Sequence, residues 1–138
     1  MKFKSLHPNF KLPTKGTALA GAYDLYMPEF GSLAPGEGLK FTLGFMAEVP
    51  EGFVVLMLPR SGVGSKGLML ANTCGVIDSD YRGEWFVHLL NCGRGMTWSP
   101  GDRLLQMLIV PVANVTPELA DELSETGRGA GGFGSTGK

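Results

Sequence analysis

The sequence predicts an all-β protein with a single domain. The chain has 138 residues, of which 21 are glycine and 9 are proline. This content of turn-forming residues is typical of short strands joined by tight turns, and it disfavours a helical bundle. Apolar and polar residues alternate with period two between the turns. Short strands at turn-marked spacing, without an internal repeat, predict a β-sandwich or a β-barrel.

Several segments carry the strand signal. Residues 41–49 place alternate apolar side chains on one face, as a half-buried strand requires. Residues 53–58 form an uninterrupted apolar run, which is typical of a strand covered on both faces. Alternation over residues 84–89 predicts another strand, and residues 103–112 predict the last one. Pro111 should lie at a strand end or edge, because proline cannot donate a hydrogen bond to a ladder.

Residues 116–138, at the C-terminal end of the sequence, allow more than one interpretation. Thr116 and Pro117 suit the start of a short helix over residues 116–123, but the same stretch could run extended across a neighbouring surface. Residues 127–138 are too rich in glycine to fold alone. They are either a disordered terminus or a flap that grips phosphate through arginine and backbone N–H groups and covers a base with phenylalanine.

Charge and composition exclude several classes of function. With 12 basic and 13 acidic residues, the formal net charge is -1, so no basic field attracts nucleic acid or an anionic membrane. No apolar run approaches the ~20 residues of a membrane span, and the first ten residues lack the apolar stretch of a signal peptide. Two cysteines and two histidines are too few and too scattered for a zinc site. These features predict a cytoplasmic protein with reduced thiols.

Two loops carry residues suited to chemistry. Residues 59–62, Pro-Arg-Ser-Gly, follow the apolar run and combine a guanidinium, a hydroxyl and a glycine, which together suit an anion pocket. Residues 75–83 place Asp78, Asp80 and Tyr81 between glycines, just before the strand at 84–89. Taken alone, the first segment suits an ordinary turn equally well, and the second suits a hairpin turn.

The order of these pieces resembles the trimeric dUTP pyrophosphatases (dUTPases), whose five motifs all have counterparts in this chain. The counterparts are residues 21–25, 59–62, 72–83, 101–106 and 128–137. The third and fifth motifs are long and specific. Three details depart from the family pattern: the order Gly21-Ala22 is reversed, no histidine follows Lys66, and Ala130 replaces an acid.

The resemblance implies a jelly-roll-like, distorted β-barrel of the β-clip type over residues 1–126. It also implies a homotrimer with shared active sites, in which residues 127–138 form a flexible flap over a neighbouring subunit's site. Neither nucleic acid nor a membrane is an expected partner. The expected location is the cytoplasm, or the host cytoplasm for a viral protein.

The resemblance further implies hydrolysis of dUTP to dUMP and pyrophosphate, with Mg2+ as cofactor and water attacking the α-phosphorus. In the cell this reaction lowers dUTP and supplies dUMP for thymidylate synthesis. Asp78 matches the general base, because a carboxylate within hydrogen-bond reach of water can take its proton. Arg60, Ser61 and Gln106 match catalytic residues that contact the phosphates. Asp24 matches a residue that holds a metal-bound water or braces Arg60.

By the same resemblance, Asn72 and the backbone after it would pair with the uracil edge, and Tyr81 would pack against the deoxyribose and exclude a 2′-hydroxyl. Arg128 would clamp the terminal phosphates while Phe133 covers the uracil. The complete expected substrate-binding set is Arg60, Ser61, Gly62, Asn72, Gly75, Val76, Ile77, Asp78, Tyr81, Gln106, Arg128, Phe133, Gly134, Ser135 and Thr136.

Two rival functions are compatible with parts of this pattern. The related dCTP deaminases share the fold, but His88 stands where their catalytic glutamate would fall, and no second arginine follows Ser61. A regulatory protein could also keep the scaffold and act by contacting a partner. Because the chain holds every residue that hydrolysis needs, hydrolysis is favoured. Cys74 and His88 are most simply packing residues.

Overall fold

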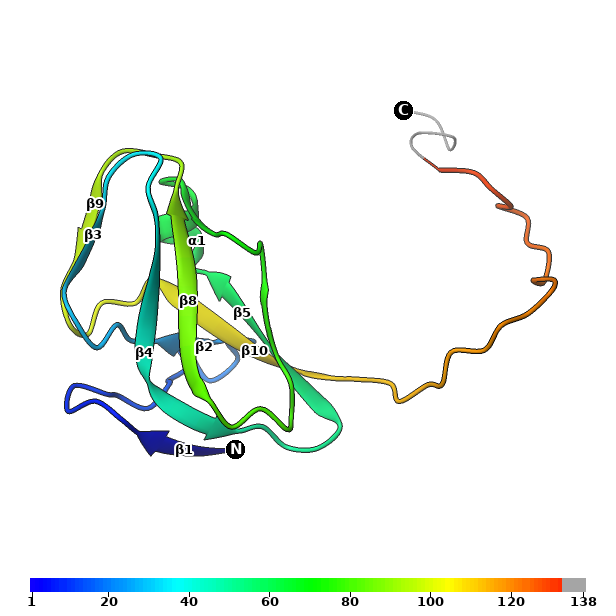
Figure 1. The fold of residues 1–138 in the computed structure, drawn as a ribbon, viewed down its shortest axis with the longest axis horizontal. Coiled ribbons are helices and arrows are strands. Elements are labelled where there is room, and N and C mark those ends of the chain that lie inside the picture. Colours follow the sequence, from blue (N-terminus) through cyan, green and yellow to red (C-terminus); the bar gives the residue numbers. More distant parts are fainter. Residues whose placement is uncertain (133–138) are drawn as a thin grey trace.

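The computed structural model describes residues 1–132, which form ten strands and one four-residue helix (Figure 1). The strands are β1 Lys2–Ser5, β2 Tyr23–Leu25, β3 Gly31–Leu33, β4 Gly38–Glu48, β5 Phe53–Pro59, β6 Leu68–Leu70, β7 Gly75–Ile77, β8 Glu84–Asn91, β9 Met96–Trp98 and β10 Leu105–Pro111. The helix is α1 Ser61–Gly64. The predicted all-β class is therefore confirmed.

The strands form two four-stranded sheets and a small two-stranded one. The first sheet has the order β1-β4-β8-β6, the second β2-β10-β5-β7, and β3 pairs with β9. Every pairing is antiparallel. In Figure 1, β4 and β8 lie side by side across the body, and β10 crosses behind them. This order leaves β2 and β7 at opposite edges of the second sheet.

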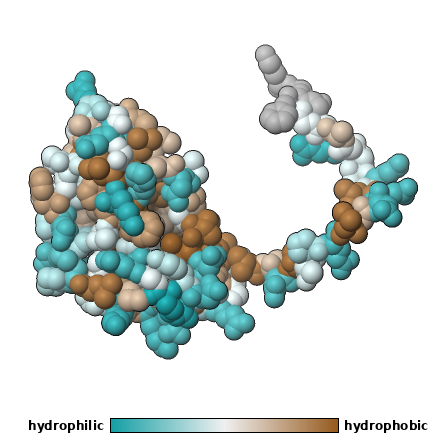
Figure 2. Space-filling view, viewed as in Figure 1, coloured by the Kyte–Doolittle hydropathy of each residue, from teal (hydrophilic) through white to brown (hydrophobic). Residues whose placement is uncertain are grey.

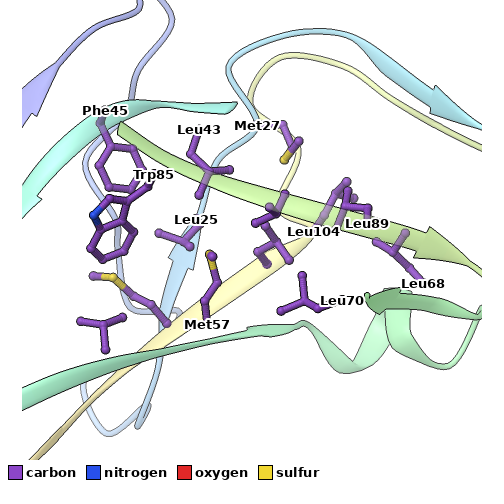
Figure 3. Close-up of a cluster of buried hydrophobic side chains, with 14 of the residues drawn as sticks. Leu25, Met27, Leu43, Phe45, Met57, Leu68, Leu70, Trp85, Leu89 and Leu104 are labelled. Atoms are coloured by element: carbon purple, nitrogen blue, oxygen red, sulfur yellow. The ribbon is translucent and has the colours of Figure 1, made fainter. Parts of the chain in front are cut away.

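The core lies between the two large sheets (Figure 3). Side chains of β4 and β8, including Phe45 and Trp85, meet Leu25 and Met57 from the second sheet. The predicted inward face of residues 41–49 is confirmed, because its last four apolar members are at most 4% exposed. A register shift between β4 and β8 accompanies Gly44, which adopts a positive φ of 71°. The alternation over residues 84–89 is confirmed in the same way.

The strand at residues 53–59 differs in part from its prediction. Val55 and Met57 on one face of β5 are buried, whereas Val54 and Leu56 on the other face are only partly buried and Phe53 is exposed. Within this chain, one face of β5 is therefore buried at Val55 and Met57, whereas its other face is only partly covered. The position predicted for Pro111 is confirmed, since it is the last residue of β10.

Residues 112–132 leave the body after β10 as an extended arm (Figures 1 and 2). Residues 116–123 form no helix, so the first of the two alternatives is wrong. The arm exposes apolar side chains along its length, namely Val112, Val115, Leu119 and Leu123. Within residues 1–132, no helix is long and apolar enough to cross a membrane.

Candidate functional site

Ten of the predicted site residues line two separate hollows at different places on the body. A hollow of about 520 Å3 is bordered by the third-motif residues Asn72, Gly75, Val76, Ile77, Asp78 and Tyr81. A second hollow of about 350 Å3 is bordered by Asp24, Arg60, Ser61 and Gln106. The structure thus sorts the predictions from the sequence into two groups with different chemistry.

The larger hollow is built on an exposed sheet edge. β7 pairs with β5 on one side only, so part of its backbone polar groups face outward. Gly75 lets β7 approach β5 closely, because a Cβ there would lie 3.1 Å from the Met57 Cε atom. An unpaired strand edge beside an apolar floor suits a flat ligand that carries its own donors and acceptors.

A strained turn leads into that edge. Thr73 has a φ of 63°, which is unfavourable for a β-branched residue and costs on the order of 1–3 kcal/mol. The Asn72 carbonyl accepts hydrogen bonds from the Cys74 amide at 2.7 Å and the Thr73 hydroxyl at 2.6 Å. The Asn72 carbonyl is therefore occupied by hydrogen bonds within the turn. The residue also lies on the border of the hollow.

The loop after β7 places a carboxylate and a phenol on the rim of the same hollow. The Tyr81 amide donates to the Asp78 carbonyl at 3.2 Å, and the Tyr81 hydroxyl donates to the Glu84 carbonyl at 3.0 Å. Arg82 Nη1 donates to the carbonyls of Ser79 at 2.7 Å and Tyr81 at 3.1 Å. These bonds fix a short turn between β7 and β8, so Asp78 and Tyr81 are held relative to each other.

The smaller hollow contains an excess of positive charge. Asp24, 7% exposed on β2, accepts from Arg60 Nε at 2.7 Å and from Arg103 Nη1 at 3.0 Å. Two guanidinium groups on one carboxylate leave a net charge of about +1. Gln106 Nε2 donates to the Pro59 carbonyl at 3.2 Å, which places its amide beside Arg60 and the exposed Ser61. This arrangement suits an anionic ligand, because guanidinium groups and hydroxyls donate strongly to phosphate oxygens.

Sequence reasoning did not single out Arg103. It lies in the segment 101–106, which is interpreted from sequence only as a motif counterpart and as part of a turn and strand. Its partner Asp24 is distant in sequence and is brought near by the pairing of β2 with β10. The remaining predicted residues lie elsewhere. Gly62 is exposed in α1, and Arg128 lies on the arm, where its Nε donates to the Gly131 carbonyl at 2.9 Å. The predictions for Phe133, Gly134, Ser135 and Thr136 fall outside the described residues.

The two hollows lie near different ends of β5. Ile77, just before Asp78, pairs with Val55 near the start of β5, whereas Arg60 follows its end. Five strand residues at about 3.3 Å each separate those positions by about 16 Å. The two groups of side chains therefore lie near different ends of β5 and do not form one cluster within this chain.

Comparisons with known proteins agree on one family. A family model described as dUTPase matches residues 8–137. The deoxyuridine 5'-triphosphate nucleotidohydrolase of Escherichia phage T5 is 40% identical to this chain, over 99% of this chain and 98% of the relative. Among solved structures, the dUTPase of Staphylococcus bacteriophage 80alpha with dUPNHPP has a TM-score of 0.91 at 26% identity, over 99% of this chain and 98% of that one.

A further solved structure is of a dUTPase variant from phage phi11 of S. aureus, in which a structural Mg(II) ion is coordinated. It has a TM-score of 0.80 at 23% identity, over 88% of this chain and 96% of that one. At that identity the likeness concerns the fold alone.

Proposed function

This chain belongs to the dUTPase family, and from that premise we propose that it hydrolyses dUTP to dUMP and pyrophosphate. The predicted family and the jelly-roll-like fold are confirmed. The observation that carries the proposal is the division of the site residues. A hollow of about 520 Å3 with a carboxylate on its rim accompanies a second hollow that carries excess positive charge.

The larger hollow would bind the nucleoside. The exposed edge of β7 and the Asn72 side chain would pair with the polar edge of uracil. Cytosine presents the inverted pattern of donors and acceptors, so its binding would leave polar groups unpaired at a cost of about 1–3 kcal/mol each. Tyr81 would pack against the deoxyribose, where a 2′-hydroxyl would find no room.

The reaction would join groups from both hollows. Asp78 would take a proton from a water molecule as the water oxygen attacks the α-phosphorus. The bond from that phosphorus to the bridging oxygen would break, and pyrophosphate would leave with the bonding electron pair. Arg60, Ser61, Gly62 and Gln106 would hold the phosphates and stabilise the negative charge that develops on the leaving group.

We propose Mg2+ as the cofactor. Within residues 1–132, no group of three His, Cys, Asp or Glu side chains is arranged to hold a metal ion. Both oxygens of Asp24 already accept from guanidinium groups. Phosphate oxygens and water are thus the expected ligands, with Asp24 reaching the ion only through a water molecule. When bound, Mg2+ would neutralise charge on the triphosphate.

A rise of about 16 Å along β5 separates the residue next to Asp78 from Arg60, which supports a site shared between subunits, and we propose the homotrimer of the family. Residues 1–126 would form the barrel domain, and residues 127–138 the flap that brings Arg128 and residues 133–136 onto a neighbour's site. The extended arm of residues 112–132, with its exposed apolar side chains, suits such a reach. The cytoplasm, the host's for a viral protein, is the proposed location.

The test is pyrophosphate release from dUTP, dCTP, dTTP and UTP in the presence of Mg2+, for the wild type and for Asp78→Asn. Selective turnover of dUTP that falls by at least about 1,000-fold in Asp78→Asn is expected, because the variant lacks the base. Asp80→Asn is the matched control, since this nearby carboxylate borders a different hollow. A wild type that leaves dUTP intact, or that releases ammonia from dCTP, would contradict the proposal.

A further inference from the structure

The Tyr81 ring is held in place by the residues that follow it in the chain. Its hydroxyl donates to the Glu84 carbonyl at 3.0 Å, so the side chain folds back along the loop toward the start of β8. The residue is 37% exposed and borders the larger hollow. The position of the ring therefore sets part of the boundary of that hollow.

Gly83 lies directly against this ring. A Cβ atom at Gly83 would lie 2.6 Å from Tyr81 Cζ and 3.0 Å from Cε2, and it would be closer still to the hydroxyl oxygen. Carbon atoms in proteins pack at about 3.5–4.0 Å, so a methyl group cannot occupy this space while the ring stays. Gly83 does not adopt a left-handed backbone conformation, so alanine is compatible with its backbone, and the three atoms nearest to the added Cβ all belong to the Tyr81 side chain.

The backbone around Gly83 has little freedom to relieve such a clash. On one side, Arg82 closes the turn by donating to the Ser79 and Tyr81 carbonyls. On the other, Glu84 begins β8, and the next residue, Trp85, is fully buried in the core. The Tyr81 side chain can move aside, because part of its surface faces solvent. A methyl at position 83 would therefore displace the ring.

We propose that Gly83 is a positioning residue for sugar discrimination, acting through Tyr81. The inference rests on the proposed function, in which the Tyr81 ring packs against the deoxyribose. The missing side chain at position 83 allows the ring to lie close to the loop, and the Glu84 carbonyl holds it there. A displacement of about 1 Å is enough to change the fit of a bound substrate. Glycine at this position thus contributes to the preference for a 2′-deoxy sugar.

The test measures kcat/KM for dUTP and UTP in the wild type, Tyr81→Ala, Gly83→Ala and the double variant. We expect Gly83→Ala to reduce the ratio of kcat/KM for dUTP to kcat/KM for UTP by about 10-fold or more. The variant should still hydrolyse dUTP, because Asp78 is unchanged. The double variant should match Tyr81→Ala, because the methyl then has no ring to displace. Gly95→Ala is the control, since a Cβ there would approach nothing closer than 3.9 Å.

The melting temperatures of the same four proteins provide a second readout that does not depend on activity. If the methyl clashes with the ring, Gly83→Ala should lower the melting temperature, and the double variant should restore it to that of Tyr81→Ala. An unchanged substrate ratio in folded Gly83→Ala, or additive effects in the double variant, would overturn the proposal. A wild type inactive on dUTP would instead overturn the proposed function, while the melting temperatures would still test the contact.

Discussion

At the residue scale, Asp24 shows how one buried carboxylate organises the charged hollow. Each of its oxygens accepts from a different guanidinium, Arg60 Nε on one side and Arg103 Nη1 on the other. Arg60 borders the hollow, whereas Arg103 reaches the carboxylate from the segment just before β10. Both guanidinium groups hold the one carboxylate, so the cluster keeps an excess positive charge that can attract an anion.

Arg103→Gln should destabilise the fold, because it leaves one oxygen of a buried carboxylate without its charged partner. The expected loss in the free energy of unfolding is about 1–3 kcal/mol, measured by urea denaturation. Arg103→Lys should recover part of that loss by keeping a positive charge. Arg94→Gln, at an exposed arginine of the β8–β9 loop, is the control and should change stability by less than about 0.5 kcal/mol. Equal losses at both arginines would contradict this account.

At the element scale, short strands are tied together by buried polar side chains as well as by ladders. Asn91, the last residue of β8, is fully buried. Its Nδ2 donates to the carbonyls of Leu33 at 3.1 Å and Arg94 at 2.8 Å, with a third contact to Ala34 at 3.2 Å. Its Oδ1 accepts from the Gly93 amide at 3.0 Å. One side chain thus joins the end of β3 to the loop that follows β8.

Asn91→Leu should be among the more destabilising substitutions in the body. The apolar side chain has a similar volume but leaves several buried backbone groups without a partner. The expected loss is about 3 kcal/mol or more in the free energy of unfolding, measured by thermal and urea denaturation. Asn114→Leu on the exposed arm is the matched control and should have little effect. A stability close to the wild type in Asn91→Leu would show that water replaces these bonds.

The sequence predicted those parts of the molecule that depend on neighbours in the chain. The burial of residues 41–49 and 84–89 follows their own alternation, and the residues of 72–83 gather because they are contiguous. The pairing of Asp24 with Arg103 depends on the order β2-β10-β5, which no local pattern encodes. Residues 116–123 carry start signals for a helix, but a short helix needs a packing surface, and the exposed arm has none within this chain.

At the scale of the whole molecule, the arm and the body have separate roles. The body contains both hollows and the core, whereas residues 112–132 extend away from it with apolar side chains exposed. Isolated apolar segments of this kind are stabilised when another surface covers them. Residues 127–132, the described part of the proposed flap, lie at the end of this arm away from the body, which supports the proposed action on another subunit.

Removal of residues 128–138 should separate stability from activity. The body keeps its core, so the melting temperature should change by no more than a few degrees. Turnover of dUTP should fall by at least about 100-fold, because the arginine and hydroxyls proposed to clamp the phosphates are lost. Steady-state kinetics and calorimetry on the same preparation provide the two measurements. Unchanged turnover in the shortened protein would remove the flap from the mechanism.

The shared site predicts that two inactive variants can restore each other. Asp78→Asn supplies an intact Arg60, and Arg60→Gln supplies an intact Asp78. If one subunit provides the carboxylate and another the guanidinium, random exchange in an equal mixture leaves 1/2 × 1/2, or about one quarter, of the sites fully wild type. Mixing Asp78→Asn with the Asp78→Asn/Arg60→Gln double variant is the control, because no intact carboxylate is present. Subunit exchange, verified by mass spectrometry, without recovery of dUTP turnover would place both groups in a site within one chain.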